Sequence, residues 1–456
     1  MRQDLRSFVE GYARTYPDEF VPVSQAINLE FDIQAVVLEL QHRRRFPILL
    51  FEHVVGHEIP VICNVMASRR ALAYGLGVEE AQMPVEYSRR LKEYVKPVVV
   101  NDPPFRHTVL TGNQVELSRL PIPTYYPADG GRYITAALTV AKDPDTGVET
   151  EGYHRFQVKG RNKMGVSLAS RRRMFDYQRR AEARGRNLEC AIVLGLHPVI
   201  GMGSLAYPPP EISKFDVVGG LFGEPLQIAP CETIDLKVPA WGEIVIEGEI
   251  LSGVREKEGP FGEFTGYLTG RSTDHVFAAK AICMRERPWY QSISGGRTPD
   301  HILPLGVLRE MEIRNAVSRV IPNVKAVHVP MSGCSAFVAF VSISQTRPGE
   351  AKHALSLIFG ADYYLKFVVV VDDDIDVYNE SDVLWALATR VQADRDIVVI
   401  SGSLGSVVDP STTEQGVTAK IGVDATRPFG QPFSETLRMS PEKMAWARDL
   451  VDRLAT

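Results

Sequence analysis

Glu258-Gly-Pro-Phe-Gly-Glu263-Phe-Thr-Gly-Tyr267 places two carboxylates five residues apart in a segment that cannot be helical. Pro260 fixes φ and lacks an N–H donor, and the glycines beside it adopt backbone angles that other residues resist. The turn is therefore expected to direct both glutamates toward one small space. Two carboxylates held close together cannot ionise independently, so one tends to keep a proton and serve as an acid near neutral pH. The alternative is a Gly/Pro-rich surface loop whose glutamates are simply solvated.

The length of the chain predicts more than one domain. With 456 residues and a mass of 50.7 kDa, it exceeds what one ordinary core holds, so two or three domains are expected. Hydrophobic residues make up 45% and charged residues 23%, which is ordinary for a globular protein and excludes a disordered chain. The formal net charge of −5 gives no sign of a nucleic-acid partner or an anionic membrane.

The cysteines and the apolar runs indicate a reducing, aqueous compartment. The five cysteines are scattered and form no CxxC or Cys/His pairing typical of a zinc site, so we expect reduced core residues. The first residues lack an apolar signal region, and no run of about 18 apolar residues could span a bilayer. A cytoplasmic location without membrane contact is expected.

The pattern of expected helices and strands divides the chain into three units. Residues 1–105 combine expected helices with the apolar strands Phe46–Phe51 and Val61–Met66, which predicts a small α/β unit. Residues 106–300 contain one short strand after another with tight turns between them, which favours a barrel-like β domain.

The third unit, residues 301–456, alternates strands and helices. The wholly apolar run Phe367–Val371 is typical of a largely parallel sheet that is covered on both faces. A helix over Asp382–Val391 is expected to be capped by Ser381. The fold class is thus a multidomain α/β and α+β chain.

Four separated segments resemble the signature blocks of UbiD-type decarboxylases, in the order in which that family carries them. They are Gly152-Tyr-His-Arg155 followed by Gly160-Arg-Asn-Lys163, Glu258–Tyr267, Asp372-Asp-Asp-Ile-Asp376 and Trp385-Ala-Leu-Ala-Thr-Arg390. The resemblance implies a central split β-barrel that binds prenylated FMN and a C-terminal α/β domain, with a linker helix, that serves in dimerisation. It also implies reversible decarboxylation of unsaturated or aromatic acids.

The resemblance assigns a catalytic Glu-Arg-Glu triad beside the flavin to Glu258, Arg155 and Glu263. A guanidinium offers two parallel donors to a carboxylate and holds a neighbouring glutamate in place. No side chain stabilises the carbanion left when CO₂ departs from an aromatic carbon, so a cofactor must carry that step. In the family the substrate forms a covalent adduct with the flavin, and we expect Glu263 to be the acid that reprotonates the carbon. An arginine on a barrel strand is otherwise most often a surface or structural residue.

One departure from the family concerns the metal ion that usually holds the cofactor phosphate through Asn, His and Glu. Thr150, Arg171 or Arg172, and Lys214 stand at those positions. Lys and Arg bind phosphate directly, so we expect these cations to replace the divalent metal. A monovalent cation near the phosphate stays open, and so does the alternative that the arginines form a solvated basic run.

Further cofactor contacts are expected from Arg155 itself, from Ser204 in Gly201-Met-Gly-Ser204, and from Lys366. In the family, backbone amides and small side chains line the flavin at the segment that corresponds to Gly201–Ser204. A family lysine near the flavin corresponds to Lys366. A lysine at the start of a buried strand is otherwise commonly a solvent-facing end residue.

The segment Gly295-Gly-Arg297-Thr-Pro-Asp-His301, with Arg309 eight residues later, lies at the junction of two expected domains, where pockets are favoured. Its spacing resembles the subgroup that converts furan-2,5-dicarboxylate to 2-furoate. We therefore expect Arg297, His301 and Arg309 to bind a second carboxylate, since a monoacid would leave such groups without partners. Pyrrole-2-carboxylate or another aromatic acid is the neighbouring possibility, and His301 has a structural role as its alternative.

Two functions from different classes remain. The complete Glu258, Arg155 and Glu263 set favours a decarboxylase, whereas the missing metal ligands favour a non-catalytic, cofactor-poor subunit of a multi-component carboxylase. The expected partners are a small aromatic acid, a flavin prenyltransferase that supplies the cofactor, and further copies of the chain in a homodimer or higher homo-oligomer.

Overall fold

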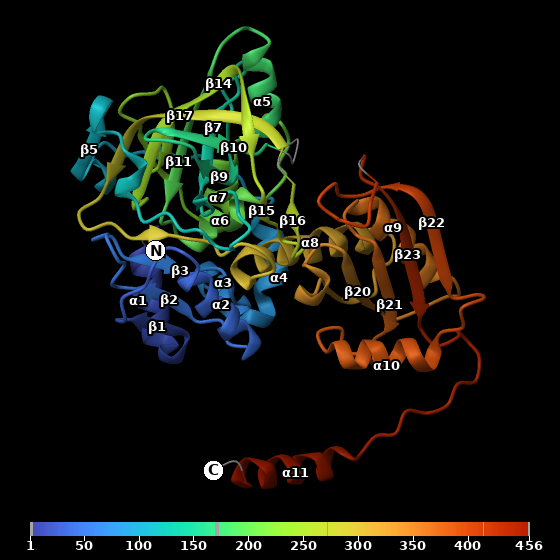
Figure 1. Cartoon of the computed structure of the whole chain (residues 1–456). Coiled ribbons are helices and arrows are strands. Elements are labelled where there is room, and N and C mark those ends of the chain that lie inside the picture. The colour runs from blue at the N-terminus through green and yellow to red at the C-terminus, as the bar shows by residue number, and fades with distance from the viewer. Residues whose placement is uncertain (1–2, 169–172, 271, 414, 455–456) are drawn as a thin grey trace.

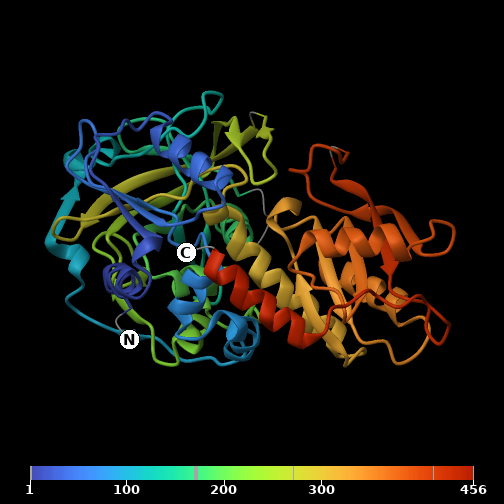
Figure 2. The ribbon, with the colours of Figure 1, turned by 90° about the horizontal axis from the view of Figure 1, so that it is seen from below.

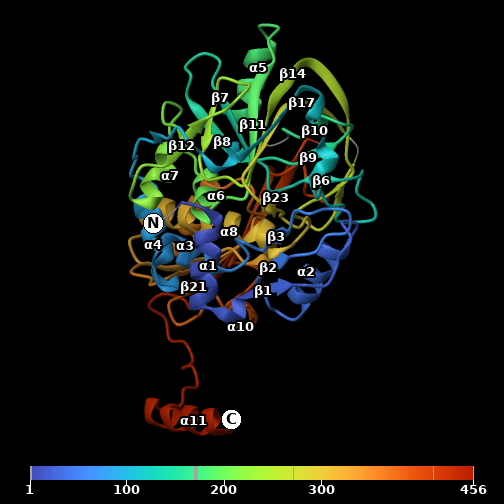
Figure 3. The same ribbon diagram turned by 90° about the vertical axis from the view of Figure 1, so that its left-hand side faces the viewer.

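A computed structural model describes residues 3–168, 173–270, 272–413 and 415–454. In Figure 1 the N-terminal unit lies beneath a large β domain, and the C-terminal domain lies beside both. Figure 3 shows the same stacking from the side. The long helix α8 (Pro299–Ser318) runs between the two halves of the molecule, as the view from below shows (Figure 2).

The N-terminal unit is an α/β layer, as predicted. Its sheet has the order β1-β2-β3-β18, so its last strand comes from the far end of the β domain. Strand β18 therefore links the N-terminal unit to the β domain. The elements are α1 (Leu5–Thr15), η1 (Pro17–Glu19), β1 (Phe20–Val23), α2 (Asp32–His42), β2 (Ile48–Phe51), β3 (Val61–Cys63), α3 (Arg69–Leu76), η2 (Glu80–Gln82), α4 (Met83–Arg90) and β18 (Tyr290–Gln291).

The central domain is built on a nine-stranded sheet of order β6-β9-β10-β17-β14-β11-β7-β8, with β5 paired to β17. Successive side chains of a strand point to opposite faces. In β11 they enter two different cores: Ile192 and Leu194 join one, and Ala191 and Val193 join the other. The strands are β5 (Thr108–Thr111), β6 (Tyr133–Ile134), β7 (Leu138–Lys142), β8 (Glu149–Tyr153), β9 (Phe156–Val158), β10 (Lys163–Val166), β11 (Leu188–Leu194), β14 (Ile244–Glu258) and β17 (Ser272–Met284).

Short elements close this domain around the large sheet. A three-stranded sheet and the hairpin of β15 with β16 lie at its edges. These elements are β4 (Val98–Val99), η3 (Pro104–His107), η4 (Gly112–Gln114), η5 (Leu117–Arg119), α5 (Arg173–Glu182), α6 (Pro198–Ser204), α7 (Lys214–Phe222), β12 (Gln227–Pro230), β13 (Lys237–Pro239), β15 (Phe261–Gly262) and β16 (Leu268–Thr269).

The C-terminal sheet has the order β19-β20-β21-β23-β22, and helices cover both faces as predicted. Ala354 and Ile358 of α9 pack on one face, and Val383 and Ala386 of α10 pack on the other. The elements are β19 (Val324–His328), η6 (Met331–Gly333), β20 (Val338–Ile343), α9 (Glu350–Ala361), β21 (Phe367–Asp372), α10 (Glu380–Arg390), β22 (Ile397–Leu404) and β23 (Val417–Ala425).

Two details of this domain differ from the prediction. The sheet is mixed rather than largely parallel, because only the inner pairs β20/β21 and β21/β23 are parallel and both edge pairs are antiparallel. The cap of α10 is Asn379 rather than Ser381, since the Asn379 side chain accepts a hydrogen bond from the backbone N–H of Ser381. Ser381 therefore lies inside the first turn.

A last helix, α11 (Pro441–Leu454), stands well away from the rest of the chain in Figures 1 and 3. None of its side chains is buried. The multidomain α/β fold is confirmed. The domain limits at residues 105 and 300 stay predictions, and α8 begins next to the second limit, at Pro299.

Candidate active site

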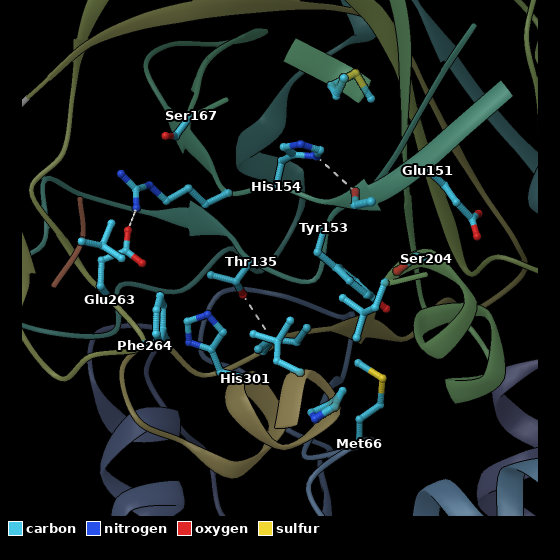
Figure 4. Close-up of a pocket in the computed structure, with 18 of the residues that line it drawn as sticks. Met66, Thr135, Glu151, Tyr153, His154, Ser167, Ser204, Glu263, Phe264 and His301 are labelled. Carbon is cyan, nitrogen blue, oxygen red and sulfur yellow. Dashed lines mark hydrogen bonds and ion pairs between the residues drawn. The ribbon is translucent and has the colours of Figure 1, made fainter. Parts of the chain in front are cut away.

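A cavity of about 400 Å³ opens where the β domain, α8 and the C-terminal domain meet (Figure 4). Strand β8 and the residues after it supply one side, from Thr150 to Arg155. The β15 hairpin supplies Glu263 and Phe264, and α8 supplies His301. Tyr364 and the segment 406–408 close the cavity from the C-terminal domain. The site is therefore assembled from segments far apart in the sequence.

Arg155 joins the two predicted carboxylates. Its Nε and Nη2 each donate to Glu258 at 2.9 Å, and its Nη1 forms an ion pair with Glu263. The Glu258 side chain is completely buried, whereas that of Glu263 is 13% exposed and reaches the cavity wall. The guanidinium also lies over the Phe261 ring, 4.9 Å from its centroid. The structure thus brings the three residues together, with Glu263 as the carboxylate that faces the cavity.

Backbone hydrogen bonds hold the turn that carries the two glutamates. The Asp129 carboxylate accepts from the backbone N–H of Gly262 at 3.0 Å, and the Gln157 side chain accepts from that of Gly259 at 3.2 Å. Gly259 and Gly266 have φ of 91° and 82°, a region that favours glycine. The glutamates are therefore fixed by a turn that other residues would not form.

The Arg155 guanidinium is kept charged by its two glutamate partners. Burial alone would lower the pKa of Arg155, but the hydrogen bonds to Glu258 and the charges of Glu263 and Glu258 outweigh it and raise the pKa. The guanidinium therefore stays charged.

Lys214 and Glu151 mark the other end of the cavity. Lys214 is the first residue of α7, and its amino group donates to the carbonyl of Ser204. Ser204 in turn donates through its hydroxyl to the carbonyl of Gly201 at 2.7 Å. Glu151 is buried, and neither of its carboxylate oxygens has a hydrogen-bond partner among the described residues. Burial raises the pKa of Glu151 to about 8, although the charge of Lys214 works against this shift.

The residues at this end fit a phosphorylated cofactor. Lys214 and Arg173 are cations on the cavity wall, and Thr150 beside them is neutral and buried. Within the described residues, no three His, Cys, Asp or Glu side chains come together as a metal site. Lysine and arginine side chains are groups that can bind a phosphate directly. The predicted contacts Arg171 and Arg172 lie outside the described residues.

His301 lies where it was predicted, on the cavity wall beside Phe264 (Figure 4). Its Nδ1 lies 2.9 Å from the carbonyl of Gly296, which can only accept, so Nδ1 carries the proton. Burial lowers the pKa of His301. Arg297 is exposed and packs its side chain against Gly266, outside the residues that line the cavity.

Two predicted contacts lie behind the cavity wall and have partners of their own. Arg309 donates to Asp362 at 2.8 Å, and Lys366 donates to Asp409 at 2.6 Å. Neither side chain lines the cavity. The premise that Arg309 would lack a partner without a second substrate carboxylate is therefore wrong.

Several lining residues escaped the sequence analysis, among them Glu151, Asp300 and Tyr364. Asp300 is buried and accepts from the backbone N–H groups of Asn64 and Met66 at 2.9 and 2.7 Å, and burial raises its pKa to about 7. In the sequence Glu151 lies four residues before Arg155 and Asp300 directly before His301, but no periodicity marked either residue. Tyr364 gave no signal either.

Comparison with known families gives matches along most of the chain. The family models of the N-terminal, Rift-related and C-terminal domains of 3-octaprenyl-4-hydroxybenzoate carboxy-lyase, UbiD, match residues 15–91, 96–298 and 303–425. An anhydromevalonate phosphate decarboxylase from Methanothermobacter thermautotrophicus is 33% identical over 426 residues, which are 93% of this chain and 97% of that relative.

Solved structures match equally far. The UbiD-class enzyme HmfF from Pelotomaculum thermopropionicum, in complex with FMN, is 34% identical with a TM-score of 0.92, over 98% of this chain and 99% of that one. Apo 3,4-dihydroxybenzoic acid decarboxylase (AroY) from Klebsiella pneumoniae is 27% identical with a TM-score of 0.89, over 98% and 99% of the two chains.

Proposed function

This chain belongs to the UbiD family of prenylated-FMN-dependent decarboxylases, and we propose that its substrate is a heteroaromatic acid, with furan-2,5-dicarboxylate the best candidate. It is an enzyme, a carboxy-lyase. In the proposed reaction the dicarboxylate loses one carboxylate as CO₂ and gains one proton at the same carbon, which yields 2-furoate.

The observation that carries this proposal is the placement of the triad. Arg155 is held by the buried Glu258 and presents its guanidinium on the cavity wall beside Glu263. Arg155 would orient the scissile carboxylate through the second N–H of Nη1 and of Nη2, since the other donors are bonded to Glu258 and Glu263. Glu263 would donate its proton to the ring carbon after CO₂ has left, and would then regain a proton from solvent.

Prenylated FMN supplies the electron sink that no side chain offers. We propose that Lys214 and Arg173 hold its phosphate, with Ser204 on the same wall, and that this contact needs no divalent metal. A monovalent cation beside Glu151 would be compatible with this charge arrangement. Lys366 supports the site from behind its wall rather than by direct contact.

Recognition of the second carboxylate is proposed for His301 and for Arg297, which is exposed and lies outside the residues that line the cavity. With Nδ1 bonded to the Gly296 carbonyl, His301 donates to a substrate only when Nε2 is also protonated. A carboxylate brought next to it would favour that protonated form. The aromatic walls of Phe264 and Tyr364 suit a flat ring.

Two other substrates have some support. Pyrrole-2-carboxylate shares the flat five-membered ring and lacks the second carboxylate. A phosphorylated non-aromatic acid is suggested by the relative named anhydromevalonate phosphate decarboxylase, which matches 93% of this chain.

The proposed partners are a flavin prenyltransferase, which would supply the cofactor, and further copies of this chain. The C-terminal helix supports self-association, because its apolar side chains Met444, Trp446, Val451 and Leu454 are all exposed. No helix in the described part of the chain is long and apolar enough to cross a membrane.

The experiment is a substrate panel on the holoenzyme, produced together with a flavin prenyltransferase. Release of CO₂ and formation of the decarboxylated product would be measured for furan-2,5-dicarboxylate, 2-furoate, pyrrole-2-carboxylate, 3,4-dihydroxybenzoate and anhydromevalonate phosphate. We expect the highest kcat/KM for furan-2,5-dicarboxylate. A higher value for pyrrole-2-carboxylate or for anhydromevalonate phosphate would overturn this substrate and support the alternative.

A further inference from the structure

The C-terminal domain closes the cavity with a wall made of Tyr364 and the segment 406–408, which we call the C-terminal wall. It faces the hairpin that carries Glu263, and Tyr364 contacts Phe264 with ring centroids 6.5 Å apart. A substrate beside Glu263 would therefore lie between this hairpin and the C-terminal wall.

Arg309 fixes Tyr364 through Asp362. One Asp362 oxygen accepts from Arg309 Nε at 2.8 Å, and the other accepts from the backbone N–H of Tyr364 at 2.8 Å. The Arg309 guanidinium also lies 4.6 Å from the centroid of the Tyr364 ring. The ion pair is mostly buried, with side-chain exposures of 11% and 13%. The helix α8 thus positions both the backbone and the ring of Tyr364.

Two lysines fix the remainder of the wall. Lys420 donates to the carbonyls of Tyr363 and Leu365, on either side of Tyr364, at 2.9 and 2.8 Å. Lys366 donates to Asp409 and to the hydroxyl of Ser411, both at 2.6 Å, directly after the segment 406–408. Lys366, Lys420 and the Nε of Arg309 are thus each bonded to the protein itself.

We propose that Arg309 is a positioning residue for the proposed decarboxylation: through Asp362 it holds Tyr364 against the substrate, and it does not bind a substrate carboxylate. The substrate in this inference is taken from the proposed function. The hydrogen bonds of Arg309 and Asp362, which support the positioning role, do not depend on that function. A misplacement of about 1 Å at an active site costs on the order of 100-fold in rate.

The two roles of Arg309 predict opposite results for Asp362→Asn. If Arg309 positions Tyr364, Arg309→Ala and Asp362→Asn lower kcat/KM by a similar factor, on the order of 10- to 100-fold, for the dicarboxylate and for a monoacid alike. The double variant is then no worse than the singles. If Arg309 binds the substrate, Arg309→Ala lowers kcat/KM for the dicarboxylate alone. Asp362→Asn then frees the guanidinium and leaves kcat/KM for the dicarboxylate unchanged or raises it.

The measurement combines steady-state kinetics of the holoenzymes with amide hydrogen exchange of residues 362–366. Faster exchange in both single variants is expected, because the side chain at position 362 that accepts from the backbone N–H of Tyr364 loses its anchor on Arg309. Arg314→Ala is the matched control, since Arg314 lies on the same helix and donates to the carbonyl of Lys325 at 2.9 Å, away from Tyr364. Unchanged exchange in both variants, or a loss confined to the dicarboxylate, overturns the proposal. If the wild-type enzyme uses neither acid, the proposed function fails while the exchange arm still decides the role of Arg309.

Discussion

Glu258 accepts two hydrogen bonds from Arg155, each 2.9 Å long, with a side chain that is wholly buried. Glu263 shares the same guanidinium but lines the cavity. The two carboxylates are therefore not equivalent. Glu258 balances a buried cation and fixes its orientation, whereas only Glu263 reaches the space in which a substrate carbon would be protonated.

Removing the two carboxylates should therefore have different effects. Glu263→Gln should lower kcat by about 10²–10³-fold, the usual cost of losing one transition-state donor, with little change in Tm. Glu258→Ala leaves the buried guanidinium of Arg155 without its main partner and should destabilise the protein by on the order of 3–5 kcal/mol. Turnover on the preferred acid and thermal unfolding of each variant check this. Near wild-type turnover of Glu263→Gln would remove it as the acid.

The cofactor phosphate should bind without a divalent metal. Treatment of the holoenzyme with EDTA should release no flavin, because Lys214 and Arg173 are cations on that part of the wall that can bind the phosphate directly. Lys214→Ala should weaken FMN binding by roughly 1.5–3 kcal/mol, the contribution of a hydrogen bond to a charged group. Titration of the apoprotein with FMN measures this, and Lys237→Ala on the exposed end of β13 is the control. Stoichiometric manganese in active, freshly purified enzyme would contradict the prediction.

The two glutamates of the triad could be predicted from the sequence because they lie on one short turn. Gly259, Pro260 and Gly266 dictate a turn, and the turn places both glutamates. Arg155 lies 103 residues from Glu258, so its place beside them came from the family resemblance and not from spacing.

The roles of Arg309 and Lys366 could not be predicted from the sequence, because their partners depend on tertiary contacts. Arg309 pairs with Asp362, 53 residues away, and Lys366 with Asp409, 43 residues away. No periodicity reports such a pairing, and an unassigned cation near a domain junction looks like a ligand contact.

Stability of the apoprotein should fall with pH because of Glu151. Its pKa is about 8 in the folded protein against an ordinary value near 4.5, so between these values the folded state holds a proton that the unfolded state has lost. The free energy of unfolding then decreases as pH rises toward 8, by at most ~1.4 kcal/mol per pH unit. Asp300, whose pKa is about 7 in the folded protein, also lowers the free energy of unfolding as pH rises, but only up to about pH 7.

Urea unfolding at pH 7 and pH 8.5 separates the two groups. Wild-type apoprotein should lose more stability over this interval than Glu151→Gln, whose amide does not ionise. Equal losses in the two proteins would contradict an ionisation of Glu151 between pH 7 and pH 8.5 in the folded protein. The cofactor-free protein is required, because a phosphate beside Lys214 would change the charge around Glu151.

The helix α11 should be needed for self-association. An isolated helix of 14 residues is only marginally stable in water, so the exposed Trp446, Leu450 and Leu454, spaced one turn apart, call for a covering surface. The chain's own body does not provide it, as none of these side chains is buried. A second copy that receives the helix would bury them and return its own helix by symmetry. A chain ending at Ser440 and the variant Trp446→Ala should therefore show a lower molar mass in light scattering at micromolar concentration, whereas Asp449→Asn, on the polar face, should not. A truncated chain with the mass and Tm of the full-length protein would contradict this role.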